Sequence, residues 1–220
     1  MAFDGWWTEP GGKGERIEWA TTVLTEEGHI LYAKWRKVVF AVGDIGPAGG
    51  YVFYDKGSYS SGWQYLEAAP AGWSGVSEDP KYVFGYQREG PTDDNQWVYT
   101  YRFIGDGRAN TVALVNAMGD QAYVSPRGKT KATYAAKVAA DYSTTVEGDV
   151  YDDWFLPSWE ELYTMYTNLK LENLGGFSDS YYWASTAYYD IGGWVQGFHE
   201  ASYGYYPRDK VLAVRPIRAF

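Results

Sequence analysis

Short runs of alternating apolar and polar residues, separated by glycine-rich turns, dominate the first third of the chain. The segment 51–54 predicts a strand, the polar stretch 55–62 predicts a turn, and the segment 63–68 predicts the partner strand of a hairpin. Aromatic clusters around the Pro-Gly-Gly turn at 10–12 indicate further β-structure within residues 1–36. The pattern predicts that the chain begins with strands and tight turns.

Helical spacing enters in the second half of the chain. Apolar residues three positions apart predict a helix over 110–118, and an alanine-rich stretch predicts another over 134–142. Ser158 and Glu161 have the spacing of a capping box, which predicts that a third helix starts there. The predicted apolar faces are Val112, Val115 and Met118 in the first helix, and Leu162, Met165, Tyr166 and Leu169 in the third. We interpret all three helices as scaffold.

The composition of the chain excludes several classes of function. The 220 residues suit one large domain, or one domain with a small appendage. A net charge of −9 argues against a nucleic-acid partner, whose phosphates need neutralising by Lys and Arg. The absence of Cys excludes disulfides, thiolate zinc sites and cysteine catalysis. We expect no cofactor and no metal, and no apolar run approaches the ~20 residues of a membrane span.

The most unusual segment is the aromatic run Tyr181–Tyr206. It holds seven Tyr, two Trp and one Phe in 26 residues, mixed with Gly, Ser and Ala. A hydrophobic core would use Leu, Ile and Val, whereas Tyr with Ser and Gly is typical of binding loops. The segment therefore predicts a binding surface, with part of its aromatic side chains packed in the interior.

Residues 194–200 alternate in a way that predicts a strand ending near Phe198. Side chains of successive strand residues point to opposite faces. One set is Trp194, Gln196 and Phe198, and the other is Val195, Gly197 and His199. We expect the first set to pack and the second set to face a ligand.

Two resemblances to known families cover most of the chain. The motifs at 3–7 (Phe-Asp-Gly-Trp-Trp), 8–12 and 31–35 (Leu-Tyr-Ala-Lys-Trp) resemble the Listeria–Bacteroides surface repeat. The resemblance implies a partial β-rich repeat or spacer over 1–36, followed by a second domain over 37–220.

The second domain carries four motifs in order: 43–54, 154–162, 176–186 and 214–220. Together they resemble bacterial C-type-lectin-fold domains of the formylglycine-generating-enzyme type. The resemblance implies an α+β C-type lectin fold of mixed short strands, a few helices and much irregular loop. Among these domains the chain resembles the variable proteins of diversity-generating retroelements, most closely those of treponemes.

That family implies a variable region over about 181–220, in which template adenines are mutated. An AAC codon mutated only at its adenines cannot encode Trp, Gln, Glu, Lys or Met. Trp183, Trp194, Gln196, Glu200 and Lys210 are therefore predicted to be fixed. The predicted ligand contacts are Tyr188, Tyr189, Asp190, Val195, Gly197, His199, Tyr203, Tyr205, Tyr206, Arg208 and Asp209.

The resemblance implies a monomeric ligand-binding lipoprotein of the outer membrane, displayed at the cell surface, with its lipid anchor outside this chain. Its ligand is expected to be a protein or glycan on another cell or host surface, and no catalysis is expected. The alternative is a carbohydrate-active or formylglycine-generating-type enzyme. The latter chemistry depends on cysteines, and no carboxylate spacing singles out a glycosidase pair. The Glu-Pro-Asn, Gln-Pro-Asp and Trp-Asn-Asp triplets of calcium-dependent lectins are also absent from the candidate region.

Overall fold

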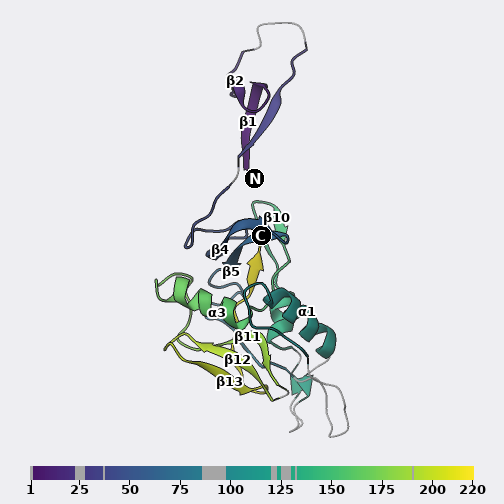
Figure 1. The fold of residues 1–220 in the computed structure, drawn as a ribbon, viewed down its shortest axis with the longest axis vertical. Helices are drawn as coiled ribbons and strands as arrows, with labels where there is room; N and C mark the ends of the chain where they lie inside the picture. Colours follow the sequence, from purple (N-terminus) through teal and green to yellow (C-terminus); the bar gives the residue numbers. More distant parts are fainter. Residues whose placement is uncertain are drawn as a thin grey trace. The chain divides into compact units, whose positions relative to one another are not determined.

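The computed structural model describes residues 2–22, 28–36, 38–85, 98–119, 123–124, 130–131, 133–189 and 191–220 (Figure 1). The chain divides into two compact units, Met1–Phe40 and Ala41–Phe220. Strands make up 36% and helices 16%, as several small sheets and three short helices in the described part. The expected α+β C-type lectin fold is therefore wrong, because the protein is mostly β. Polar or glycine-rich segments that lack a clear hydrophobic pattern pair as strands.

The first unit is a three-stranded antiparallel sheet. Its strands are β1 (Ala2–Glu9), β2 (Lys13–Ile17) and β3 (Tyr32–Arg36), in the order β2-β1-β3. The β1–β2 turn contains two glycines with positive φ, Gly11 and Gly12, as the Pro-Gly-Gly sequence predicts. The rings of Phe3 and Trp35 meet edge-on across the β1–β3 pair at 5.5 Å.

A hairpin opens the second unit. Its strands, β4 (Tyr51–Ser60) and β5 (Trp63–Ala68), pair with β15 (Ile217–Ala219) in the order β15-β5-β4. The second strand has the predicted bounds. The first runs six residues beyond the prediction, to Ser60, so the turn is only Ser61 and Gly62. The extra residues are mostly polar and mostly exposed, and their sequence therefore has no apolar alternation that would predict a strand.

A five-stranded sheet holds most of the aromatic run. Its order is β13-β12-β11-β14-β6, and all adjacent pairs are antiparallel except β11 with β14. Figure 1 shows β11, β12 and β13 side by side. Its strands are β6 (Lys81–Tyr82), β11 (Tyr181–Tyr188), β12 (Gly192–Gly197), β13 (Tyr203–Pro207) and β14 (Leu212–Ala213). Two small hairpins complete the strands: β7 (Tyr123–Val124) with β8 (Thr130–Lys131), and β9 (Thr144–Val146) with β10 (Asp149–Tyr151).

The helices are α1 (Gly107–Met118), α2 (Ala135–Ala140) and α3 (Trp159–Met165), and α3 continues as a π-helical turn, Tyr166–Lys170. The predicted capping box of Ser158 and Glu161 is confirmed. The predicted stripe of α3 is also confirmed, because all four of its side chains are buried. The predicted face of α1 is right only in part, because Val115 and Met118 are half-buried against the core but Val112 is not. Its buried residues are Gly107, Asn110, Thr111 and Leu114, whereas Val112 is 55% exposed.

The five-stranded sheet is buried on both faces at its centre. On one face α3 packs against β11 and β12, and Leu162 and Met165 join Tyr182 and Phe198 in one core cluster. On the other face α1 and α2 pack against β11, and a second cluster forms around Trp183. A strand covered on both faces has no solvent side, so alternation alone does not reveal which of its residues are exposed.

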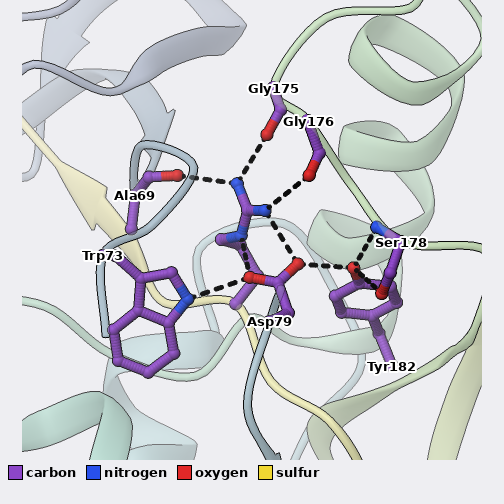
Figure 2. A network of polar contacts seen from close by, with 8 residues as sticks. Ala69, Trp73, Asp79, Gly175, Gly176, Ser178 and Tyr182 are labelled. Carbon is purple, nitrogen blue, oxygen red and sulfur yellow. Dashed lines mark hydrogen bonds and ion pairs between the residues drawn. The ribbon is translucent and has the colours of Figure 1, made fainter. Parts of the chain in front are cut away.

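A buried polar network ties the end of the chain to β11 (Figure 2). The Arg215 guanidinium makes two bonds of 2.7 Å to the Asp79 carboxylate and donates to the carbonyls of Ala69 and Gly175. The Tyr182 hydroxyl donates to the same carboxylate, and the Trp73 indole N–H does so at 3.0 Å. Burial, followed by the charge of Asp79, raises the pKa of Tyr182 above its ordinary range. This network fixes β11 against the terminal strands.

Candidate functional site

Seven aromatic side chains form a continuous row over the edge half of the five-stranded sheet and the start of α3. We call it the aromatic row; it consists of Trp159, Tyr163, Tyr188, Tyr189, Trp194, Tyr203 and Tyr205. Tyr189, Tyr203, Tyr205 and Tyr163 are 43–60% exposed, and the other three are half-buried. Each ring contacts at least one other member, with centroids 3.9–6.5 Å apart.

The strand register places the row on one face of the sheet. Trp194 of β12 lies opposite Tyr205 of β13, and Tyr188 of β11 lies opposite Gly192. Gly192 belongs to β12, which lies between β11 and β13. Because it has no side chain, it leaves a gap on this face of the sheet. Across that gap the rings of Tyr188 and Tyr205 stack at 3.9 Å with planes 13° apart. A Cβ at Gly192 would lie 2.6 Å from the Tyr206 carbonyl oxygen and 3.3 Å from the Tyr205 ring.

Helix α3 supplies the other end of the row. Trp159 contacts Trp194 at 5.7 Å and Tyr203 at 5.2 Å, and Tyr163 stacks on Trp159 one turn later. Sequence reasoning treated this helix only as scaffold and therefore missed both residues. The sequence did contain a signal, because Trp159 and Tyr163 are four residues apart and so share one face of the helix. That face differs from the predicted buried stripe.

A buried carboxylate fixes the start of α3. Glu161 accepts hydrogen bonds from the backbone N–H of Ser158 at 2.6 Å and of Gly105 at 2.8 Å. Burial raises the pKa of Glu161 to about 7, although these hydrogen bonds oppose the rise. The loop before α1 and the first turn of α3 are thereby held together. This arrangement sets the position of Trp159, the first residue of the helix.

The predicted contact residues divide between several places. Four lie in the aromatic row: Tyr188, Tyr189, Tyr203 and Tyr205. Tyr206 and His199 lie on the opposite face, where each ring packs on Tyr181 at about 5 Å. Asp209 is exposed in the turn after β13, and Asp190 lies outside the described residues.

Three predicted contacts are buried and are therefore corrected. Val195 is fully buried, Gly197 is buried, and Arg208 is 2% exposed. Val195 packs in the cluster around Trp183, because the face expected to meet ligand is covered by α1 and α2. The Arg208 guanidinium lies 5.3 Å from the centre of the Phe84 ring and donates to the Tyr189 carbonyl. Its role is to support the β11–β12 turn from beneath.

The residues predicted to be fixed also differ in burial. Trp183 and Gln196 are fully buried, as expected of fixed packing residues. Trp194 was expected in the interior, but it is half-buried and joins the row. Glu200 and Lys210 are exposed. Trp194, which is predicted to be fixed, thus lies among tyrosines that are predicted to vary.

A separate cleft of about 930 Å³ lies in the same unit, lined by α1, the β4–β5 turn and β15. Its charged side chains are already engaged, since Arg108 binds Asp153 at 3.2 Å, Arg218 binds the same carboxylate, and Glu161 accepts backbone N–H bonds. Among the predicted contact residues that the structure describes, none lines it. In the described part of the chain, no three His, Asp or Glu side chains converge as a metal site would require.

Neither a scan of the sequence against protein-family models nor a search of the curated proteins finds a match. Among the helices that the structure describes, none has both the length and the apolar character needed to cross a bilayer.

Proposed function

We propose that the domain binds a ligand through the aromatic row, and that a retroelement diversifies the tyrosines of that row that lie within residues 181–220. Recognition would depend on surface complementarity, without chemical conversion of the ligand. The domain would be displayed at the cell surface as part of a lipoprotein. The observation that carries this proposal is a continuous exposed aromatic surface outside the core, which in a soluble domain is typical of an interaction site.

The composition of the row supports diversification. Its sheet tyrosines are all reachable from an adenine-mutated AAC codon: Tyr188, Tyr189, Tyr203 and Tyr205. These tyrosines surround Trp194 and Trp159. An adenine-mutated AAC codon cannot encode Trp194, and Trp159 lies outside the proposed variable region. Fixed tryptophans would supply constant apolar contact, and the tyrosines would set selectivity.

The row is also suited to tight binding. Its rings are held by one another and by regular strands, so little side-chain entropy remains to be lost on association. Tyr and Trp dominate the energy of many interfaces, and removing a central one costs about 2 kcal/mol or more. Tyr205 is central, because it stacks on Tyr188 and lies opposite Trp194.

The binding test uses a random peptide display library and a glycan array, both probed with the 220-residue chain. Tyr205→Ala is expected to lower the affinity for any captured ligand at least tenfold, while the thermal stability of the domain stays nearly unchanged. Tyr59→Ala is the matched control, because Tyr59 is 69% exposed on β4, outside the row. Equal binding by both variants, or a loss of fold in Tyr205→Ala, would contradict the proposal.

Diversification has its own test in the DNA beside the gene. We expect a near-copy of the codons for residues 181–220 downstream of the stop codon, differing from the gene only where the copy has adenine. Differences at other bases would rule out this part of the proposal and leave the binding surface untouched.

A further inference from the structure

The five-stranded sheet ends at β13, which has a neighbouring strand on one side only. The hydrogen bond from the Gly197 N–H to the Ser202 carbonyl, 2.8 Å long, makes Gln196 and Tyr203 a non-hydrogen-bonded pair. By the alternation of an antiparallel ladder, Trp194 with Tyr205 is another such pair. The N–H and C=O groups of Tyr203 and Tyr205 therefore point away from β12, along the free edge. Pro207 forms a third non-hydrogen-bonded pair with Gly192, so its lack of an N–H breaks no bond to β12.

The described part of the chain leaves these outward backbone groups without a partner. Within the described residues, no backbone or side-chain hydrogen bond reaches the outward groups of Tyr203 and Tyr205. Natural sheets protect their edges with charged residues, prolines, bulges or covering segments. Strand β13 reads Tyr-Gly-Tyr-Tyr-Pro, so it carries no charge and has a proline only at its last position. The same two tyrosines are 60% and 48% exposed and lie in the aromatic row. Tyr203 and Tyr205 thus combine outward-pointing backbone groups with exposed aromatic rings.

We propose that the partner is a basic protein, one of whose extended segments adds to β13 as a sixth strand. The inference rests on the proposed function and specifies its ligand. Backbone groups of the segment would bond to Tyr203 and Tyr205, and alternate side chains would lie over the aromatic row. This mode takes its affinity from main-chain hydrogen bonds and its selectivity from alternate side chains.

Charge favours a segment that carries Lys or Arg. The chain has a net charge of −9, and exposed Glu200 and Asp209 lie just beyond the two ends of β13, where one exposed cation, Lys210, adjoins Asp209. Cationic side chains also bind favourably over the faces of Tyr and Trp rings. Two copies of this chain would repel each other, so the same charge disfavours pairing of β13 with the β13 of a second copy.

Strand addition also accommodates diversification. The outward N–H and C=O groups of residues 203 and 205 exist whichever side chains these positions carry, unless the residue is Pro. Mutation of the tyrosines would therefore change which side chains are accepted and leave the docking edge in place.

The test begins with ten-residue random peptides displayed on phage and selected on the 220-residue chain, with a glycan array in parallel. We expect enriched peptides that contain Lys or Arg and lack Pro. Each is then synthesised in two N-methylated forms, one methylated at odd and one at even positions. In a paired strand only one of these sets of N–H groups faces β13. One form should therefore bind at least tenfold more weakly, and the other should bind nearly as well as the parent.

A second arm changes the protein. Tyr205→Ala removes the ring and keeps the outward N–H, whereas Tyr205→Pro removes both without breaking a bond to β12. We expect Tyr205→Pro to bind the selected peptides at least fivefold more weakly than Tyr205→Ala, with both variants folded by thermal unfolding. If the proline variant fails to fold, the methylated peptides still decide the question.

Several results would overturn strand addition: equal effects of the two methylation patterns, enrichment of glycans without peptides, no enrichment at all, or a dimer of the free chain that Tyr205→Pro abolishes. Failure of the proposed function looks different. In that case captured ligands bind Tyr203→Ala and Tyr205→Ala as well as the parent chain.

Discussion

Arg215 and Asp79 form a two-pronged ion pair in the interior, with both N–O distances at 2.7 Å and both side chains 1% exposed. The pair joins the last strands of the chain to the loop before β6, and through the Tyr182 hydroxyl it reaches β11. The strand that ends in Tyr188, within the aromatic row, is therefore fixed at its opposite end. A surface diversified as proposed would need such a constraint, because its varied residues would not hold the fold themselves.

Arg215→Lys should lower the free energy of unfolding by about 3 kcal/mol. Lysine cannot reproduce the two parallel bonds, and it leaves the buried Asp79 carboxylate and two carbonyls short of donors. Urea unfolding of both chains measures the difference. Arg102→Lys is the control, since its contact with Glu160 is 3.7 Å long and 61% of its side chain is exposed. A loss below ~1 kcal/mol for Arg215→Lys would contradict the structure.

Gly192→Ala should destabilise the domain by roughly 1–2 kcal/mol and weaken ligand binding. The added methyl group would meet the Tyr206 carbonyl at 2.6 Å and push apart the stacked rings of Tyr188 and Tyr205. Gly204→Ala is the matched control, because a Cβ there meets no atom within 4 Å. Thermal unfolding of the two variants decides the comparison, and equal melting temperatures would refute the crowding at Gly192.

Val195→Asp should prevent stable folding, whereas Tyr203→Asp should leave stability within about 0.5 kcal/mol of the parent. Both residues fall among the positions predicted to vary. Val195 is fully buried, however, while Tyr203 is 60% exposed. An unpaired carboxylate in the interior costs several kcal/mol. Soluble yield and circular dichroism report the outcome. A folded Val195→Asp protein would mean that the inner face of β12 is open.

Rising pH should weaken the contribution of Glu161 to stability. Burial raises its pKa from 4.5 to about 7, so the folded chain holds the proton more tightly than the unfolded chain does. The resulting stabilisation is fully present below about pH 4.5 and is lost as the pH rises to about 7. It amounts to at most about 3 kcal/mol.

The measurement is urea unfolding of the parent chain and of Glu161→Gln between pH 4.5 and 8. Glutamine does not titrate, so the stability of the parent relative to the variant should be greatest at low pH. This relative stability should fall as the pH rises through about 7. A difference that stays constant across this range would show that Glu161 has an ordinary pKa.

Local signals in the sequence predicted local structure well. The strand 63–68, the capping box of Ser158 and the buried stripe of α3 depend on neighbouring residues, so a short stretch of sequence contains them. The burial of Trp183 and of Gln196 was also predicted. The fold class was not, because it depends on how distant short strands pair, and Gly- and Tyr-rich strands such as β13 carry no hydrophobic alternation.

The site was predicted only in part, for reasons of packing. Val195 looked like a ligand contact because alternation identifies two faces of a strand without showing that both are covered. Arg208 looked like a surface residue, and only the structure places its guanidinium over Phe84. Trp159 and Tyr163 join the row from a helix far away in sequence. A contact between α3 and β13 has no signature in either segment alone.

The stack of Tyr188 on Tyr205 makes the proposed repertoire epistatic. While both tyrosines are present, each ring hides one face of the other from solvent. Replacing Tyr188 with a small residue would uncover a face of Tyr205 and so change what position 205 offers, although its codon has not changed. The number of distinct surfaces is therefore not the product of independent choices at each site. Selection would act on pairs of residues, and variants that bind one ligand should show correlated substitutions at 188 and 205.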